Sequence, residues 1–70
     1  MTGVLTPREI EVLIWIGRGK TSDEIGGILF ISEKTVVNHL QNIKNKLNAS
    51  NRTHAVVIAL EKKLLGKITP

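Results

Sequence analysis

The sequence predicts an all-α fold of four helices. Three observations support this fold class: four separate helix-start signals, the absence of strand-like alternation, and connections of about two to four residues between the expected helices. With 70 residues, of which 41% are hydrophobic, the chain can build one small core. We therefore expect a single domain over residues 1–70.

The first two helices each begin with the same pair of signals. Thr6 can cap the first helix, Pro7 suits its first position, and Glu9 completes a capping box. This helix should end near Arg18 and Gly19. A second capping box follows at residues 21–24 and opens a short helix that reaches about residue 29.

The third and fourth helices are also marked by their caps. Ser32 is the expected N-cap of a helix over residues 33–47, which contains neither glycine nor proline. Asn51 is the expected N-cap of the last helix, which should run to about Leu65 with Gly66 just past its end. Inside the second helix, Gly26 and Gly27 indicate a close approach to the third helix.

The second and third helices, with a turn of about three residues between them, match the helix-turn-helix arrangement. The third helix has one narrow apolar stripe, formed by Val36, Leu40, Ile43 and Leu47. Opposite this stripe lie an ammonium group and four amides without a carboxylate: Lys34, Asn38, Gln41, Asn42 and Asn45. A merely hydrophilic surface helix is the alternative, but such a helix usually mixes acidic residues into its outer face.

This outer face has the chemistry to read the major groove of DNA. Asn38 and Gln41 can offer a donor and an acceptor together to adenine, and the methyl groups of Val37 can meet a thymine methyl. Phosphate contacts are expected from the helix start and its flanks. The candidates for these contacts are Ser32, Lys34, Thr35, Lys44, Lys46 and Arg52.

The charge distribution also favours an anionic partner. Residues 1–33 hold three basic and five acidic residues, whereas residues 34–70 hold seven basic residues and one acidic residue. The second half therefore carries the positive charge that binding to a polyanion requires, although a solvated basic surface would look the same.

Several functional classes lack support in the sequence. There is no cysteine, and neither His39 nor His54 has a second ligand at useful spacing, so we expect no metal. No catalytic triad or phosphate-binding glycine loop can be assembled, so we expect no enzyme, no cofactor and no small-molecule ligand in this chain. No apolar run is long enough to span a membrane and no signal segment is present, which favours the cytoplasm.

The residues resemble the C-terminal DNA-binding domain of LuxR-type transcription regulators. The resemblance covers about residues 4–66 and rests on segments 5–13, 19–21, 24–25 and 31–36, with His39, residues 42–43 and residues 46–47. Trp15, the turn at residues 19–21 and the stretch at residues 28–32 are more similar to the quorum-sensing branch than to the response-regulator branch.

The resemblance implies a four-helix domain whose third helix, residues 33–47, enters the major groove, with a dimer bound to an inverted repeat. It places Val37, Asn38 and Gln41 at bases, and Lys34, Thr35, Lys44 and Lys46 at phosphates. Structural roles are implied for Glu9, Leu13 and Gly19. Phe30 departs from the family pattern, because glycine or a small polar residue is usual at that position. Either Phe30 adopts a strained left-handed conformation, or its ring packs over the turn.

Helices one and four hold more apolar residues than one core face needs. Either both helices are buried on several sides, or the surplus marks contacts with another subunit or domain. In helix one the surplus stripe contains Ile10 and Ile14. In helix four the expected dimer contacts are His54, Val57, Ile58, Glu61 and Leu65.

The sequence therefore predicts sequence-specific binding of double-stranded DNA by a regulator that forms a homodimer on its site. The alternative is a helical interaction module whose basic half meets an acidic protein partner such as RNA polymerase. The third helix favours DNA, because a protein-binding face would usually expose aromatic or leucine side chains.

Overall fold

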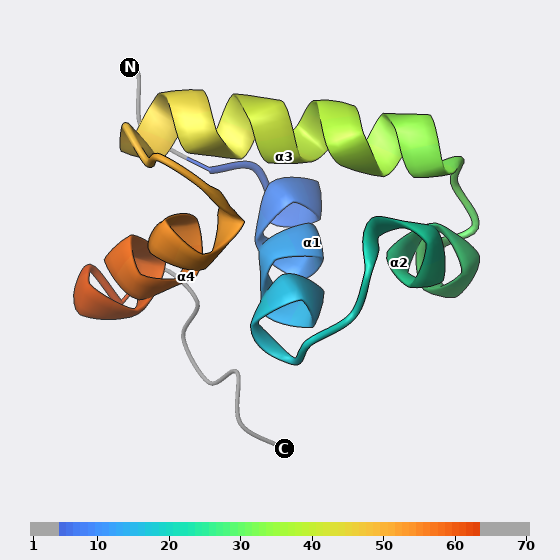
Figure 1. The fold of residues 1–70 in the computed structure, drawn as a ribbon, viewed down its shortest axis with the longest axis horizontal. Helices are drawn as coiled ribbons and strands as arrows, with labels where there is room; N and C mark the ends of the chain where they lie inside the picture. Colours follow the sequence, from blue (N-terminus) through green and yellow to red (C-terminus); the bar gives the residue numbers. More distant parts are fainter. Residues whose placement is uncertain (1–4, 64–70) are drawn as a thin grey trace.

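In the computed structural model, which describes residues 5–63, four helices follow one another along the chain. They are α1 (Pro7–Gly17), α2 (Ser22–Leu29), α3 (Glu33–Leu47) and α4 (Arg52–Glu61). Figure 1 shows α3 lying across the N-terminal end of α1, with α2 and α4 on opposite sides of α1. Helix α1 contacts each of the other three helices, whereas α2 and α4 do not touch. The all-α expectation is confirmed.

The four expected helix starts are confirmed. Thr6 and Glu9 form a capping box, in which the Glu9 N–H donates to Thr6 Oγ1 at 3.1 Å and the Thr6 N–H donates to Glu9 Oε1 at 2.9 Å. Residues 21 and 24 form the same pair of hydrogen bonds at the start of α2. Ser32 caps α3 and Asn51 caps α4. Because these caps satisfy N–H groups that helical hydrogen bonding leaves open, short polar motifs alone were enough to find them.

The expected end of α4 was wrong. The helix stops at Glu61, with Lys62 as its C-cap, and Lys63 takes a left-handed conformation with φ of 58°. The apolar stripe of this helix ends with Ala59, because the positions three and four residues later are both lysines. Leu65 and Gly66 lie outside the described residues.

The core gathers around α1 and the inner face of α3. Helix α1 carries partly buried apolar side chains on several sides, among them Ile10, Ile14 and Trp15, and all pack against the core. For this helix the first of the two interpretations of its surplus apolar residues holds. The fully or nearly buried hydrophobic residues are Leu5, Val12, Leu13, Ile25, Val36, Leu40, Ile43, Leu47, Ala55 and Ala59.

The close approach expected at the two glycines of α2 occurs at only one of them. A Cβ atom on Gly26 would lie 2.7 Å from the carbonyl oxygen of Ile31, in the turn that leads into α3. A Cβ atom on Gly27 would meet nothing within 4 Å, so the expectation was wrong for that residue. Gly26 is therefore required by packing, and Gly27 is not.

Phe30 resolves the choice that the sequence left open. Its backbone is left-handed, with φ of 59° and ψ of 43°, and 93% of the residue's surface is exposed. The ring therefore does not pack over the turn. A left-handed conformation costs a residue with a side chain roughly 1–2 kcal/mol, because Cβ crowds the following carbonyl group.

Candidate nucleic-acid interface

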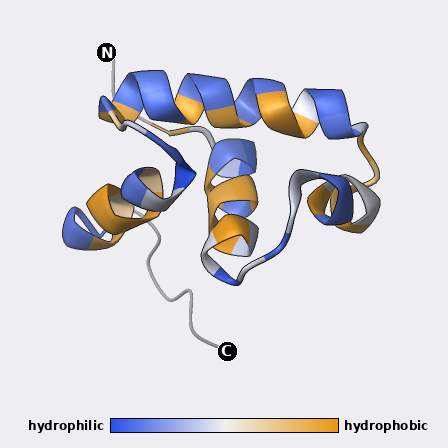
Figure 2. Cartoon of the chain, viewed as in Figure 1, coloured by the Kyte–Doolittle hydropathy of each residue, from blue (hydrophilic) through white to orange (hydrophobic). Residues whose placement is uncertain are grey.

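Helix α3 separates an apolar inner face from a polar outer face. Its inner side chains, Val36, Leu40, Ile43 and Leu47, are buried, as the sequence predicts. Figure 2 shows the hydrophobic residues of α3 turned toward the other helices and its hydrophilic residues turned outward. The exposed residues on the outer side are Lys34, Val37, Asn38, Gln41, Asn42 and Asn45.

The three candidate base-reading residues share this outer side. Asn38 and Gln41 are exposed, and Val37 has 49% of its surface exposed. The Gln41 side-chain N–H donates to Asn45 Oδ1 at 3.4 Å, one helical turn further along. Glu33, in the first turn, is the only carboxylate in α3. Beyond the first turn, the outer face can therefore donate and accept hydrogen bonds with no carboxylate to repel a phosphate.

The start of α3 is a polar, open helix end. The Thr35 N–H donates to Ser32 Oγ at 3.0 Å, and the two hydroxyl oxygens lie 2.8 Å apart. Ser32 is exposed and Thr35 is half-buried. The N–H groups ahead of Thr35 have no partner within a helix and carry the positive end of its dipole. These N–H groups can donate hydrogen bonds to an anionic oxygen, as the sequence suggests.

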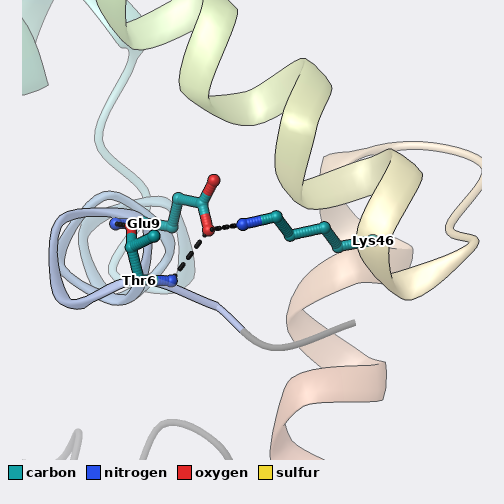
Figure 3. Close-up of polar contacts among 3 residues, drawn as sticks. All are labelled: Thr6, Glu9 and Lys46. Atoms are coloured by element: carbon teal, nitrogen blue, oxygen red, sulfur yellow. Dashed lines mark hydrogen bonds and ion pairs between the residues drawn. The ribbon is translucent and has the colours of Figure 1, made fainter. Parts of the chain in front are cut away.

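The three lysines of α3 have different surroundings. Lys46 Nζ lies 2.8 Å from Oε1 of Glu9, whose side chain is nearly buried beneath it (Figure 3). Lys34 and Lys44 make no ion pair within residues 5–63. The structure therefore leaves these two as the available α3 cations and gives Lys46 an internal partner. Its phosphate contact remains a prediction.

Sequence reasoning missed the pairing of Glu9 with Lys46. Burial by itself raises the pKa of Glu9, but the hydrogen bonds from Lys46 and Thr6, with the charge of Lys46, bring the pKa below its ordinary value. The same carboxylate caps α1, so one oxygen joins the start of α1 to the last turn of α3. The capping box gave a signal for one of these contacts, but nothing local indicates a partner 37 residues away.

Arg52 lies in a separate groove. The groove has a volume of about 390 Å³ and runs between the C-terminal end of α1 and the first turns of α4. The described residues that line it include none from α3. They are Ile16, Gly17, Gly19, Lys20, Thr21, Arg52, Thr53, Val56 and Val57. Since α3 crosses the other end of α1 (Figure 1), Arg52 is set apart from the outer-face candidates.

The expected dimer residues fall into three groups. His54, Val57 and Glu61 are exposed, and His54 Nδ1 accepts a hydrogen bond from the Ser50 N–H at 3.0 Å. Ile58 is half-buried and packs against the core, because it follows Ala55 by three residues and so shares its face. Counting Ile58 among the surplus apolar residues of this helix was therefore wrong. Leu65 lies beyond the residues that the structure describes.

One exposed apolar residue on α4 was not among the expected contacts. Leu60 follows Val57 by three residues, and 49% and 45% of their surfaces are exposed, respectively. The pair forms the outward apolar surface of α4. The three-residue spacing from Val57 was the signal that could have identified Leu60.

Two other classes of site find no support in the described part of the chain. Within residues 5–63 no group of three or more His, Cys, Asp or Glu side chains is placed to hold a metal ion. No described helix has both the length and the apolar character that crossing a membrane requires.

Comparison with known proteins identifies the same family that the sequence resembles. Residues 3–59 match the family described as bacterial regulatory proteins, luxR family. The chain is 55% identical over 60 residues to the quorum sensing-dependent transcriptional regulator VjbR of Brucella ovis, covering 86% of this chain and 23% of VjbR. It is 58% identical over 57 residues to the transcriptional activator SolR of Ralstonia solanacearum, covering 81% of this chain and 24% of SolR.

A third relative, the transcriptional activator BjaR1 of Bradyrhizobium diazoefficiens, is 49% identical over 62 residues. That alignment covers 89% of this chain and 26% of BjaR1. The chain therefore spans about a quarter of the length of the relatives it matches.

Proposed function

Because the chain belongs to the LuxR family of bacterial regulatory proteins, we propose that it is the DNA-binding domain of a transcriptional regulator, with α3 as its recognition helix. In this role it binds and does not catalyse. The observation that carries the proposal is the outer face of α3, where exposed amides and Lys34 stand without a carboxylate beyond the first turn. An α-helix with its side chains is about 10–12 Å across and fits the major groove, which is about 12 Å wide.

Within this interface the roles follow from chemistry. Val37, Asn38 and Gln41 read base edges, because an apolar group and two amides can distinguish bases. Lys34 and Lys44, together with the hydroxyl groups at the start of α3, hold the phosphates. The protein-interaction alternative is less well supported, since Val37 is the only exposed large hydrophobic residue on α3.

The proposal extends to assembly and context. Two copies bind an inverted repeat, in the cytoplasm where the chromosome lies. The relative VjbR is named for its dependence on quorum sensing, and the regulator to which this chain belongs responds to the same kind of signal.

A contact with RNA polymerase is also part of the proposal. The groove at the far end of α1 stays open when α3 lies on DNA, and Lys20 and Arg52 give its edge a positive charge. An acidic segment of the polymerase fits this charge. The double variant Lys20→Ala and Arg52→Ala in the full-length regulator should then lower transcription from a target promoter without lowering occupancy of the DNA site.

The first test is binding itself. Fragments that the chain retains should be selected from a pool of random duplex DNA, and the affinity of a selected duplex should then be measured at several salt concentrations. We expect one recurring sequence and a steep fall in affinity, because each phosphate neutralised contributes about −0.9 to the slope of log affinity against log salt. A flat salt response or an unenriched pool would contradict the proposal.

The second test separates the residues that contact bases from those that contact phosphates. Asn38→Ala or Gln41→Ala should each lose about 1–3 kcal/mol of discrimination between bases. Lys34→Ala or Lys44→Ala should weaken binding to all sequences evenly and reduce the salt slope by about one unit each. Lys62→Ala, at the exposed end of α4, removes the same charge away from α3 and is the control. If the amide and lysine variants behave alike, the outer face is not the reading surface.

A further inference from the structure

Phe30 combines two features that a folded domain usually avoids. It holds a left-handed backbone conformation at the C-cap of α2, and its ring is almost fully in water. The other left-handed turns between the helices are made by Gly19 and Asn48, residue types that accept this conformation readily. Phe30 alone puts a bulky aromatic ring at such a position between two helices of the described chain.

The turn requires the conformation but not the ring. The left-handed residue lets the N–H of Ile31 reach the carbonyl oxygen of Gly26 at 3.0 Å, which ends α2 and sets the direction of α3. A glycine would make the same turn without strain. Within residues 5–63, packing offsets neither the backbone strain nor the exposure of the ring, which points to a contact outside these residues.

The position of the turn relative to α3 indicates what the ring of Phe30 could contact. Phe30 stands two residues before the N-cap of α3, at the end of the helix from which helix-turn-helix proteins contact bases. A recognition helix fills the width of the major groove, so the residues just ahead of it meet a sugar–phosphate strand. Figure 1 shows the turn continuing directly from the N-terminal end of α3.

The surroundings of Phe30 favour DNA over a protein partner. In α2 and the turn that follows it, Ile28, with 37% of its surface exposed, is the only other exposed large hydrophobic residue. Two such residues make an apolar patch that is small for a protein interface. The nearby groups at the start of α3 are hydroxyls, open N–H groups, Lys34 and the exposed carboxylate of Glu33, and all of these except the carboxylate suit phosphates. A deoxyribose between two phosphates offers the apolar surface that this arrangement fits.

We propose that Phe30 is part of the DNA interface and packs its ring against the deoxyribose of one strand at the edge of the major groove. This inference rests on the proposed function. It adds a neutral, sequence-independent contact to those of the amides and lysines of α3.

The test compares substitutions that keep the turn. Phe30→Gly and Phe30→Asn both accept a left-handed backbone but remove the ring, and Phe30→Tyr keeps the ring. Asn48→Gly is the matched control, because Asn48 is an exposed left-handed C-cap at the opposite end of α3. Affinity for the duplex selected by the unmodified chain is measured across a salt series, and the melting temperature of each variant is measured in parallel.

Phe30→Gly should raise the melting temperature and weaken DNA binding roughly five- to tenfold, since a tenfold change corresponds to the loss of one modest apolar contact. Phe30→Asn should weaken binding similarly. The salt slope should be unchanged in both, because a neutral ring releases no counterions. Phe30→Tyr and Asn48→Gly should bind as the unmodified chain does.

The outcomes that overturn the inference differ from those that overturn the function. If Phe30→Gly and Phe30→Asn bind as tightly as the unmodified chain, with its steep salt slope intact, the ring does not touch DNA and the proposed function stands. A changed salt slope in Phe30→Gly or Phe30→Asn would also contradict a contact between the ring and DNA. So would an equal loss of affinity in Phe30→Tyr and Phe30→Gly. If the unmodified chain shows no salt-dependent binding, both the inference and the proposed function fail.

Discussion

Glu9 joins the start of α1 to the last turn of α3. Its nearly buried carboxylate accepts hydrogen bonds from the N–H of Thr6 and from Lys46 Nζ, at 2.9 and 2.8 Å. A buried carboxylate without a partner is costly, so the lysine makes burial of Glu9 tolerable. Lys46 in turn ties the last turn of α3 to α1. The pair thus fixes α1 to α3, the helix whose outer face we propose reads bases.

The lowered pKa of Glu9 makes stability depend on pH. Because the folded state lowers this pKa below 4.5, folding favours the charged carboxylate. The resulting stabilisation is present above the unfolded-state pKa and is lost as the pH falls through the lower, folded-state value. We therefore expect the free energy of unfolding, measured with urea, to decrease as the pH falls below about 4.5, the ordinary pKa of this carboxyl group.

Substitution separates this contribution from that of other carboxylates. Glu9→Gln should lower the free energy of unfolding at neutral pH by about 1–3 kcal/mol and flatten its dependence on acid pH. Glu24→Gln is the matched control, since Glu24 occupies the same place in the α2 capping box, is exposed, and has its pKa lowered chiefly by the Thr21 backbone hydrogen bond. If Glu9→Gln keeps the full acid dependence, the pair with Lys46 is not its source.

At the scale of elements, the joint between α2 and α3 depends on one glycine of an adjacent pair. Gly26 faces the backbone of the turn at a distance that a Cβ atom cannot keep, whereas Gly27 faces open space. Gly26→Ala should lower the free energy of unfolding by about 1–3 kcal/mol, because the turn must shift. Gly27→Ala should raise it by up to about 1 kcal/mol through its higher helix propensity. Urea unfolding of the two variants checks this, and equal effects of the same sign would contradict the geometry.

The elements also show what the sequence could and could not predict. Every helix start was predictable, because a cap and its partner lie within three residues of each other. The end of α4, the inward face of Ile58 and the open side of Gly27 were not, since they depend on which helices pack together. In the interface, the outer face of α3 followed from helical periodicity. The partner of Lys46 and the groove that holds Arg52 come from contacts between distant segments.

At the scale of the whole molecule, one recognition helix is too little for a genomic site. A single unit of this size reads only a few base pairs, and in the proposed assembly a second copy about one helical turn away would supply the rest. Val57 and Leu60 offer an outward apolar surface on α4, with His54 and Glu61 exposed on the same helix. This surface is small, so we expect the isolated chain to be monomeric and to pair on DNA.

Variants on α4 test this assembly. Val57→Glu with Leu60→Glu should leave the helical circular dichroism spectrum unchanged, because both side chains are already about half exposed. Binding to a half-site should survive while cooperative binding to the full inverted repeat is lost. Ile58→Glu is the less informative change, since Ile58 packs against the core. Cooperativity that persists in the double variant would place the contact on another surface.

The most direct test of the reading surface is a nuclear magnetic resonance titration of the ¹⁵N-labelled chain with the selected duplex. We expect the largest shift changes at the backbone amides of residues 30–45, and in the side-chain amides of Asn38 and Gln41, which would report contact with bases. Amides near Val57 and Leu60 should shift where two copies pair, whereas those of the groove residues outside α4, residues 16–21, should change little. Shifts concentrated in that groove or along α4, with the Asn38 and Gln41 side chains unaffected, would show that α3 is not the helix that meets DNA.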